Sequence, residues 1–171
     1  MLEETKGLRN MRRDDKAVED PVRRDRLLAT APVGRIATVG PDGPMVKPVN
    51  FLYRDGAVYI HSATAGEKID HLVADPRVCF QVEGDLAYRP ADDRPCDASY
   101  AYLSIVATGR ARFVDDAEEK SDLLNGLMAK YQPAGGYRPV TASMTASVAL
   151  IRIDIERMTT KASPPPPPAA P

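Results

Sequence analysis

The sequence predicts a small, mainly β domain in which six strands close into a barrel with helices on its flank and open ends. Six segments of strand length lie between turn signals rich in Gly, Pro and Asp, at residues 34–39, 45–53, 57–62, 77–83, 100–114 and 148–155. The second and third are joined by the short turn Arg54-Asp55-Gly56, which predicts a hairpin. Six strands in a flat sheet would leave exposed edges, and closure into a barrel removes them.

Three helices are expected between the strands or before them. Asp20 followed by Pro21 is a typical helix start, because an N-cap residue precedes proline at the first helical position, and this helix should end near Ala31. A second helix is expected over residues 65–74, where Ile69, Leu72 and Val73 have helical spacing and form its expected apolar face. A third should follow Asp115 or Asp116 and end near residue 131.

Composition favours an ordinary globular domain. The chain has 171 residues, a formal net charge of −1, 43% hydrophobic and 27% charged residues, so a general nucleic-acid binder is not expected. No apolar run could span a membrane and no signal peptide is recognisable, so the expected location is cytoplasmic. Cys79 and Cys96 are not spaced as metal ligands, so no metal site is expected.

The chain divides into three expected parts. Residues 1–15 are polar and predict an N-terminal arm, and residues 16–158 carry all six expected strands. Residues 159–171 contain a run of prolines and predict a disordered tail.

The end of the third expected strand carries the clearest functional signal. The strand ends at His61-Ser62, and Thr64 with Glu67 has the spacing of a capping box that opens a helix. Amide hydrogens at a helix start form an anion site, to which the Ser62 and Thr64 hydroxyls and the Lys68 ammonium would add. A lysine in the first turn opposes the helix dipole, and a bound phosphate would resolve that conflict. The alternative is a plain capped helix with an exposed lysine.

The preceding strand contains a second unusual combination. Pro48 cannot donate to a sheet, so it marks an edge, a bulge or a place where something docks. Lys47 shares a strand face with Val49 and Phe51, whereas Asn50 lies on the opposite face. Lys47 either reaches solvent with its tip or binds a ligand, and spacing leaves both alternatives open.

Several segments occur in an order that resembles a known family. Residues 11–157 are similar to the pyridoxamine-5′-phosphate-oxidase-like flavin-binding split barrels and, within them, to the Nim-type group named for nitroimidazole-antibiotic resistance. The ordered set carries the resemblance rather than any one motif. Its segments are residues 34–38, 47–51, 59–62, 66–68, 76–80 and 100–111, followed by Glu119-Lys120.

The resemblance implies a six-stranded antiparallel split β-barrel that forms a homodimer with two FMN sites between the subunits. Ser62, Thr64 and Lys68 would hold the FMN phosphate, in agreement with the anion site described above. Tyr102 and Ser104 would line the same cleft from the partner subunit. The residues expected along the isoalloxazine ring are Lys47, Pro48, Val49 and Asn50.

The resemblance also implies redox chemistry, with electrons passing from NAD(P)H through the flavin to a small-molecule substrate such as a nitro compound. His61 is the expected catalytic residue, because it would donate a proton or a hydrogen bond to the nitro group. The alternative for His61 is a structural histidine bonded to a backbone carbonyl. His71, inside the second helix, is expected to be an exposed surface residue.

Three other functions stay open at this stage. The chain could bind flavin without turnover, as a sensor or store. It could be a split barrel that binds a deazaflavin or heme. It could also lack a cofactor and bind proteins, in which case the proline tail would matter.

Overall fold

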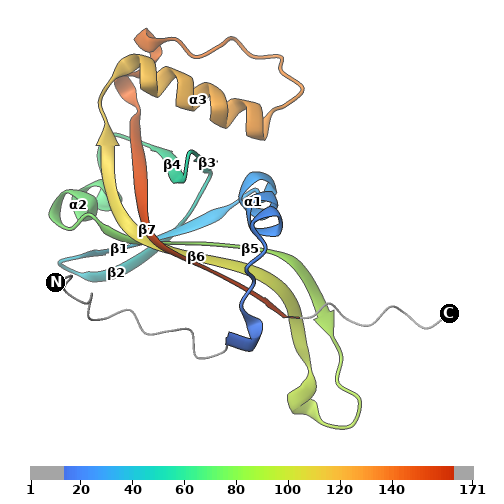
Figure 1. Ribbon diagram of the computed structural model, residues 1–171. Coiled ribbons are helices and arrows are strands. Elements are labelled where there is room, and N and C mark those ends of the chain that lie inside the picture. The colour runs from blue at the N-terminus through green and yellow to red at the C-terminus, as the bar shows by residue number, and fades with distance from the viewer. Residues whose placement is uncertain (1–13, 164–171) are drawn as a thin grey trace, which may run out of the picture.

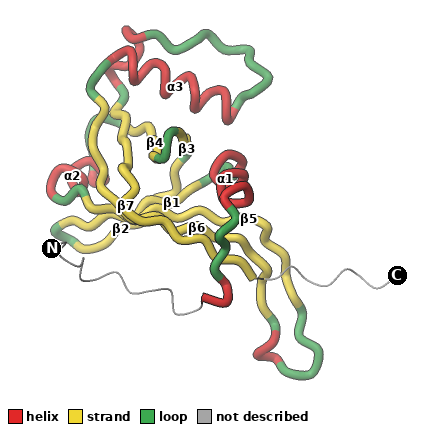
Figure 2. The backbone as a smooth tube through the Cα atoms, viewed as in Figure 1, coloured by secondary structure: helices red, strands yellow, loops and turns green. Residues whose placement is uncertain are grey.

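The computed structural model describes residues 14–163, so the first 13 residues of the expected arm and residues 164–171 of the expected tail lie outside the described residues. Figures 1 and 2 show a strongly curved sheet with helices beside it. The elements in chain order, with η for a 3-10 turn, are η1 (Asp14–Lys16), α1 (Pro21–Thr30), β1 (Gly34–Gly40), β2 (Gly43–Val49), β3 (Leu52–Arg54), β4 (Ala57–Ser62), α2 (Glu67–Ala74), β5 (Arg77–Arg89), η2 (Pro95–Asp97), β6 (Ser99–Val114), α3 (Ala117–Tyr131), η3 (Ala142–Ser147) and β7 (Ala149–Ser163).

The strand order explains the barrel. The described strands form one antiparallel sheet in the order β2-β1-β5-β6-β7-β4-β3. β2 and β3 are the two ends of that order, yet only Asn50 and Phe51 separate them in the chain. The sheet therefore curves until its two edges approach each other, which produces a barrel split between β2 and β3 (Figure 1). The expected antiparallel, mainly β class with flanking helices is confirmed.

The strand count differs from the expected six, because the segment 45–53 forms two strands rather than one. Phe51 turns into the core, where it is fully buried, and its backbone N–H and C=O both bond the Tyr131 hydroxyl instead of a neighbouring strand. Pro48 lies in β2 opposite Arg35 of β1, and none of the other described strands pairs with the free side of β2. Of the alternatives for Pro48, the structure therefore supports an edge strand.

Two apolar clusters stabilise the described chain. The larger fills the barrel and includes Phe80, whose ring meets that of Phe51 edge-on with centroids 4.9 Å apart. The smaller joins the outward faces of β4 and β7 to α3, through Tyr59, Leu127 and Leu150 among others. α3 therefore covers one outer side of the barrel, as Figure 1 shows.

Glycine permits the bend expected near Gly109. The pairing of β6 with β7 shifts register between Thr108 and Gly109, which is the mark of a bulge. A side chain at Gly109 would collide with the backbone oxygen of Asp154 on β7, so the close approach of the two strands requires glycine there.

Two strands extend beyond their expected ends. β5 continues to Arg89, with a register shift between Gly84 and Ala87. Asp85 has a φ of 55° at this shift, so the residues that predicted a loop form a bulge within the strand. β5 and β6 thus form an arm that projects from the barrel in Figure 2. β7 continues to Ser163, paired with Tyr102, so residues 159–163 belong to the sheet and not to the expected tail.

The first helix forms as expected. The Asp20 side chain accepts hydrogen bonds from the backbone N–H groups of Val22 and Arg23, and α1 starts at Pro21. Among residues 14–163, no helix is both long and apolar enough to cross a membrane.

Candidate functional site

The site begins where β4 passes into α2. β4 ends at His61-Ser62 as expected, but α2 starts at Glu67 with Gly66 as its N-cap, and no side chain of the described part of the chain caps it. The expected Thr64–Glu67 capping box is therefore wrong. Gly66 has a φ of 118°, which glycine adopts readily, and this turn directs the chain into the helix and leaves Thr64 outside it.

Two lysines gather beside the start of α2. The Lys47 Nζ of β2 lies 3.6 Å from an oxygen of the Glu67 carboxylate. Partial burial, and secondarily the charge of Lys47, lowers the pKa of the Lys68 ammonium. Glu67 offsets part of the positive charge. An anion beside the two ammonium groups would reduce their repulsion, so this corner has the donor chemistry that a phosphate requires.

A second feature lies on the α3 side of the same strand end. His61 follows Tyr59 on the β4 face that packs toward α3, whereas Ile60 between them points into the barrel. His61 and Asn50 line a pocket of about 230 Å³, whose other lining residues are Leu124, Leu127, Met128, Tyr131 and Val140. Neither His61 nor Asn50 has a side-chain hydrogen-bond partner within residues 14–163, and His61 is exposed. Both polar groups can therefore serve a ligand in this pocket.

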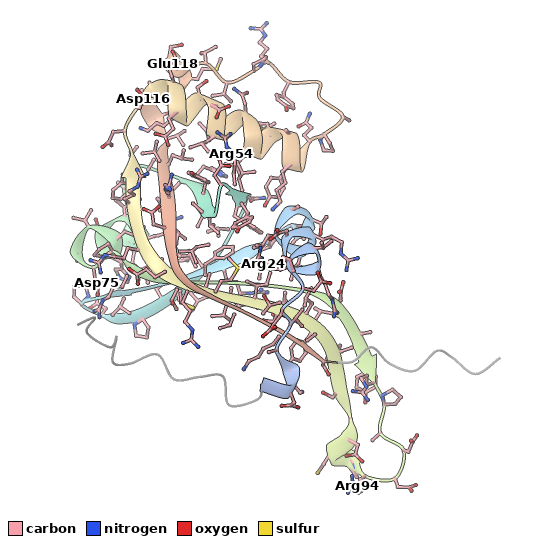
Figure 3. All side chains as sticks on the ribbon, in the orientation of Figure 1. Arg24, Arg54, Asp75, Arg94, Asp116 and Glu118 are labelled. Atoms are coloured by element: carbon pink, nitrogen blue, oxygen red, sulfur yellow. The ribbon has the colours of Figure 1, made fainter. Side chains whose placement is uncertain are left out.

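The helix that forms one wall of this pocket, α3, is held at several points. Asp116 caps it by accepting from the N–H of Glu119, and Arg54 of β3 forms an ion pair with Asp122 at 2.6 Å. Figure 3 shows Asp116 at the start of α3 and Arg54 beneath the helix. The Lys130 ammonium, near the end of α3, donates to the Leu28 carbonyl oxygen at 3.1 Å. These bonds fix α3 against both the sheet and α1.

The structure does not bring all the expected phosphate ligands together. Thr64 lines a separate depression of about 260 Å³ that also contains Lys120 and Asp115. Ser62 is partly buried and pairs with Ala149 of β7. Of the three, only Lys68 lies in the cationic corner, and its electrostatic neighbour there is Lys47, which was expected along the flavin ring rather than at the phosphate.

Tyr102 and Ser104 lie elsewhere in the chain. They line a depression of about 320 Å³ on the outward face of β6, together with Glu83, Lys161 and two apolar side chains, Leu86 and Tyr100. The Lys16 ammonium lies 5.8 Å from the centroid of the Tyr102 ring. A single chain therefore does not place these two residues beside His61. Within residues 14–163, no three His, Cys, Asp or Glu side chains gather as a metal site would need.

His71 corrects one expectation. It is buried, not exposed, with its Nδ1 3.0 Å from the Thr38 Oγ1 and its ring against Gly40 of β1. Val73, expected on the apolar face, is 71% exposed instead. The helix is rotated relative to the expected face, because His71 and Leu72 together turn toward the sheet.

Sequence patterns do not identify the remaining pocket residues as a site, and the reason is physical. Leu124, Met128 and Tyr131 have the spacing of an ordinary core-facing helix, and Val140 lies in a segment that reads as a loop. Their common pocket arises only when α3 docks over β4, and no local pattern encodes that docking.

The comparison with protein families identifies the family of this chain. A model of the family described as pyridoxamine 5′-phosphate oxidase matches residues 20–162. The chain belongs to this family. A search of curated proteins gave no match.

Solved structures agree on the fold of this pyridoxamine 5′-phosphate oxidase family member. A candidate 5-nitroimidazole antibiotic resistance protein from Bacteroides thetaiotaomicron has a TM-score of 0.73 and 24% identity over 85% of this chain and 86% of that one. A flavocytochrome from Azotobacter vinelandii has a TM-score of 0.80 and 21% identity over 94% and 75%. An FAD- and heme-binding protein from Mycobacterium smegmatis has a TM-score of 0.78 and 21% identity over 91% and 77%. These likenesses show the split-barrel fold.

Proposed function

We propose that this chain is an FMN-binding oxidoreductase that reduces small nitro compounds with electrons from NAD(P)H. The observation that carries the proposal is that two chemically different features lie at the same end of β4. A cationic corner formed by Lys47 and Lys68 follows this strand end. A pocket lies beside it in which His61 and Asn50 have no side-chain hydrogen-bond partner among residues 14–163.

Each group has a role in this proposal. Lys47 and Lys68 bind the FMN phosphate, with the Ser62 hydroxyl as a further donor, whereas Thr64 lines a separate depression. Pro48, Val49 and Asn50 form the strand segment along the flavin ring, and His61 donates a proton or a hydrogen bond to the substrate. FMN, when bound, supplies electron transfer between the nicotinamide and the nitro compound, while the protein positions both and excludes water.

The proposal includes a homodimer. The outward face of β6 exposes Tyr100 and Val106, which are 56% and 38% accessible, beside Tyr102 and Ser104. A second copy covering this face would remove apolar surface from water and could bring Tyr102 and Ser104 to the flavin site of its partner.

The second candidate function is a split barrel that binds a different cofactor. Two of the similar structures are a flavocytochrome and an FAD- and heme-binding protein. A split barrel of this family could therefore take heme or another flavin type, or bind flavin without turnover. The two lysines favour a cofactor that carries an anionic group, such as the phosphate of FMN, over riboflavin, which has none.

The absorption spectrum separates these functions. The proposal predicts a flavin spectrum after incubation with FMN, bleaching by NADH or NADPH without oxygen, and recovery on addition of a nitro compound. Bound flavin that neither donor bleaches would indicate a storage or sensor module. A heme spectrum with no flavin uptake would contradict the proposal.

A further inference from the structure

The pocket beside His61 has walls of two chemical kinds. The sheet side presents Asn50 and His61, and the α3 side presents only the apolar or aromatic surfaces of Leu124, Leu127, Met128 and Tyr131, with Val140 beside them. Among residues 14–163, no Lys, Arg, Asp or Glu side chain lines it. An ionic group seated against this wall would thus lose part of its hydration without gaining a permanently charged partner, which is costly.

The apolar wall is held in place before any ligand arrives. The Asn125 side chain accepts from the Val140 N–H at 2.8 Å and donates to the Val140 carbonyl at 2.9 Å. The Ser121 hydroxyl donates to the same carbonyl at 2.8 Å. Because the Tyr131 hydroxyl is bonded to Phe51, its ring is also fixed. Such preorganisation reduces the ordering cost of binding.

The volume of the pocket indicates how large a group it can seat. The pocket has about 230 Å³, compared with roughly 150 Å³ for a cavity known to hold benzene and roughly 300 Å³ at the low end for drug-sized ligands. A single substituted ring fills a space of this size, whereas a ring system as large as that of flavin would extend beyond it.

We infer that this pocket is a substrate site selective for small, uncharged, single-ring molecules with one polar substituent that reaches Asn50 and His61. The word substrate rests on the proposed function, whereas the selectivity rests on the pocket alone. Charged phosphate esters belong at the lysine corner, and the pocket rejects organic anions because it offers them no permanent positive charge.

A matched pair of probes tests this selectivity. Nitrobenzene and 4-nitrobenzoate share a ring and a nitro group and differ by one carboxylate. The full-length protein is titrated with each by calorimetry, once saturated with FMN and once without added FMN. We expect nitrobenzene to bind at least tenfold more tightly than 4-nitrobenzoate in both states. Equal affinities, or tighter binding of the anion, would overturn the inference.

A comparison of variants tests whether nitrobenzene binds in this pocket. Met128→Glu puts a carboxylate into the apolar wall and should abolish nitrobenzene binding, whereas Met144→Glu makes the same change at a methionine that is 53% exposed and outside the pocket. Leu124→Trp, which fills the pocket without adding charge, should also abolish binding and covers the case in which Met128→Glu fails to fold. Equal binding to the folded Met128 or Leu124 variant and to the Met144 variant would overturn the inference.

The two proposals fail separately in this design. If the protein takes up no FMN but binds nitrobenzene in a Met128-dependent way, the proposed function is wrong and the selectivity of the pocket is supported. If FMN binds and nitrobenzene does not, the substrate pocket is wrong and the cofactor proposal is supported.

Discussion

The Tyr131 hydroxyl bonds both backbone groups of Phe51, accepting from its N–H at 2.9 Å and donating to its C=O at 3.3 Å. These two bonds replace the sheet partners that Phe51 lacks where the chain passes from β2 to β3. The end of α3 thus holds the chain at the split of the barrel, next to Asn50 of the pocket.

Tyr131→Phe should lower the free energy of unfolding by about 1–3 kcal/mol, because it leaves a buried N–H without a partner. Urea unfolding followed by circular dichroism measures the change. Tyr137→Phe is the matched control, since Tyr137 is partly buried and its hydroxyl has no hydrogen-bond partner among residues 14–163. A similar loss in both variants would show that the Tyr131 hydroxyl does not stabilise Phe51.

Gly40→Ala should destabilise the fold by about 1–3 kcal/mol, because the added methyl group would collide with the buried His71 ring. The double variant with His71→Ala tests the cause. If the collision is responsible, adding Gly40→Ala to the His71→Ala background should cost much less. Additive losses in the unfolding free energy would exclude direct contact as the reason.

Lys130 should make stability depend on pH. Burial lowers the pKa of its ammonium to about 8, below the ordinary value of 10.5. The fold therefore disfavours the charged form, so this group's contribution to stability should become more favourable as pH rises from about 8 to 10.5. The Tm of the native protein minus the Tm of Lys130→Met isolates this contribution. This difference should increase as the pH rises from about 8 to 10.5. A pH-independent difference would contradict the assignment.

Lys68→Ala should weaken FMN binding about 10- to 100-fold, because it removes a charge-assisted bond to the phosphate. Lys120→Ala is an informative comparison, since Lys120 lines the separate depression that contains Thr64. Fluorescence titration with FMN measures both. A larger loss for Lys120→Ala would move the phosphate to the Thr64 depression.

His61→Ala should retain FMN and lose about 100-fold or more of the rate of nitro-compound reduction, because it removes the proposed proton donor. Stopped-flow reoxidation of the reduced protein separates this step from reduction by NAD(P)H. An unchanged reoxidation rate would assign His61 to another role.

The sequence was sufficient to predict the fold class, because alternation and turn chemistry are local signals. The last residue of β4 and the start of α1 agree with the sequence prediction, because the residue pattern changes sharply at Ser62 and at Asp20. The break at Phe51 was not predictable, because it depends on the hydroxyl of Tyr131, which is 80 residues away.

The site was predictable in part for the same reason. Lys47 and Lys68 were both identified from local anomalies, and the structure brings them close enough to interact electrostatically. The pocket of His61 and Asn50 depends on how α3 docks, and the burial of His71 depends on the rotation of α2. Both are tertiary outcomes that periodicity does not specify.

The most direct test of the account compares FMN with riboflavin, which has the same ring system and no phosphate. Spectroscopic titration of the full-length protein should show saturable FMN binding at one site per chain, with riboflavin at least tenfold weaker. That difference should nearly disappear in Lys68→Ala. Failure to bind FMN, or equal affinity for the two compounds, would contradict a flavin held through its phosphate at the lysine corner.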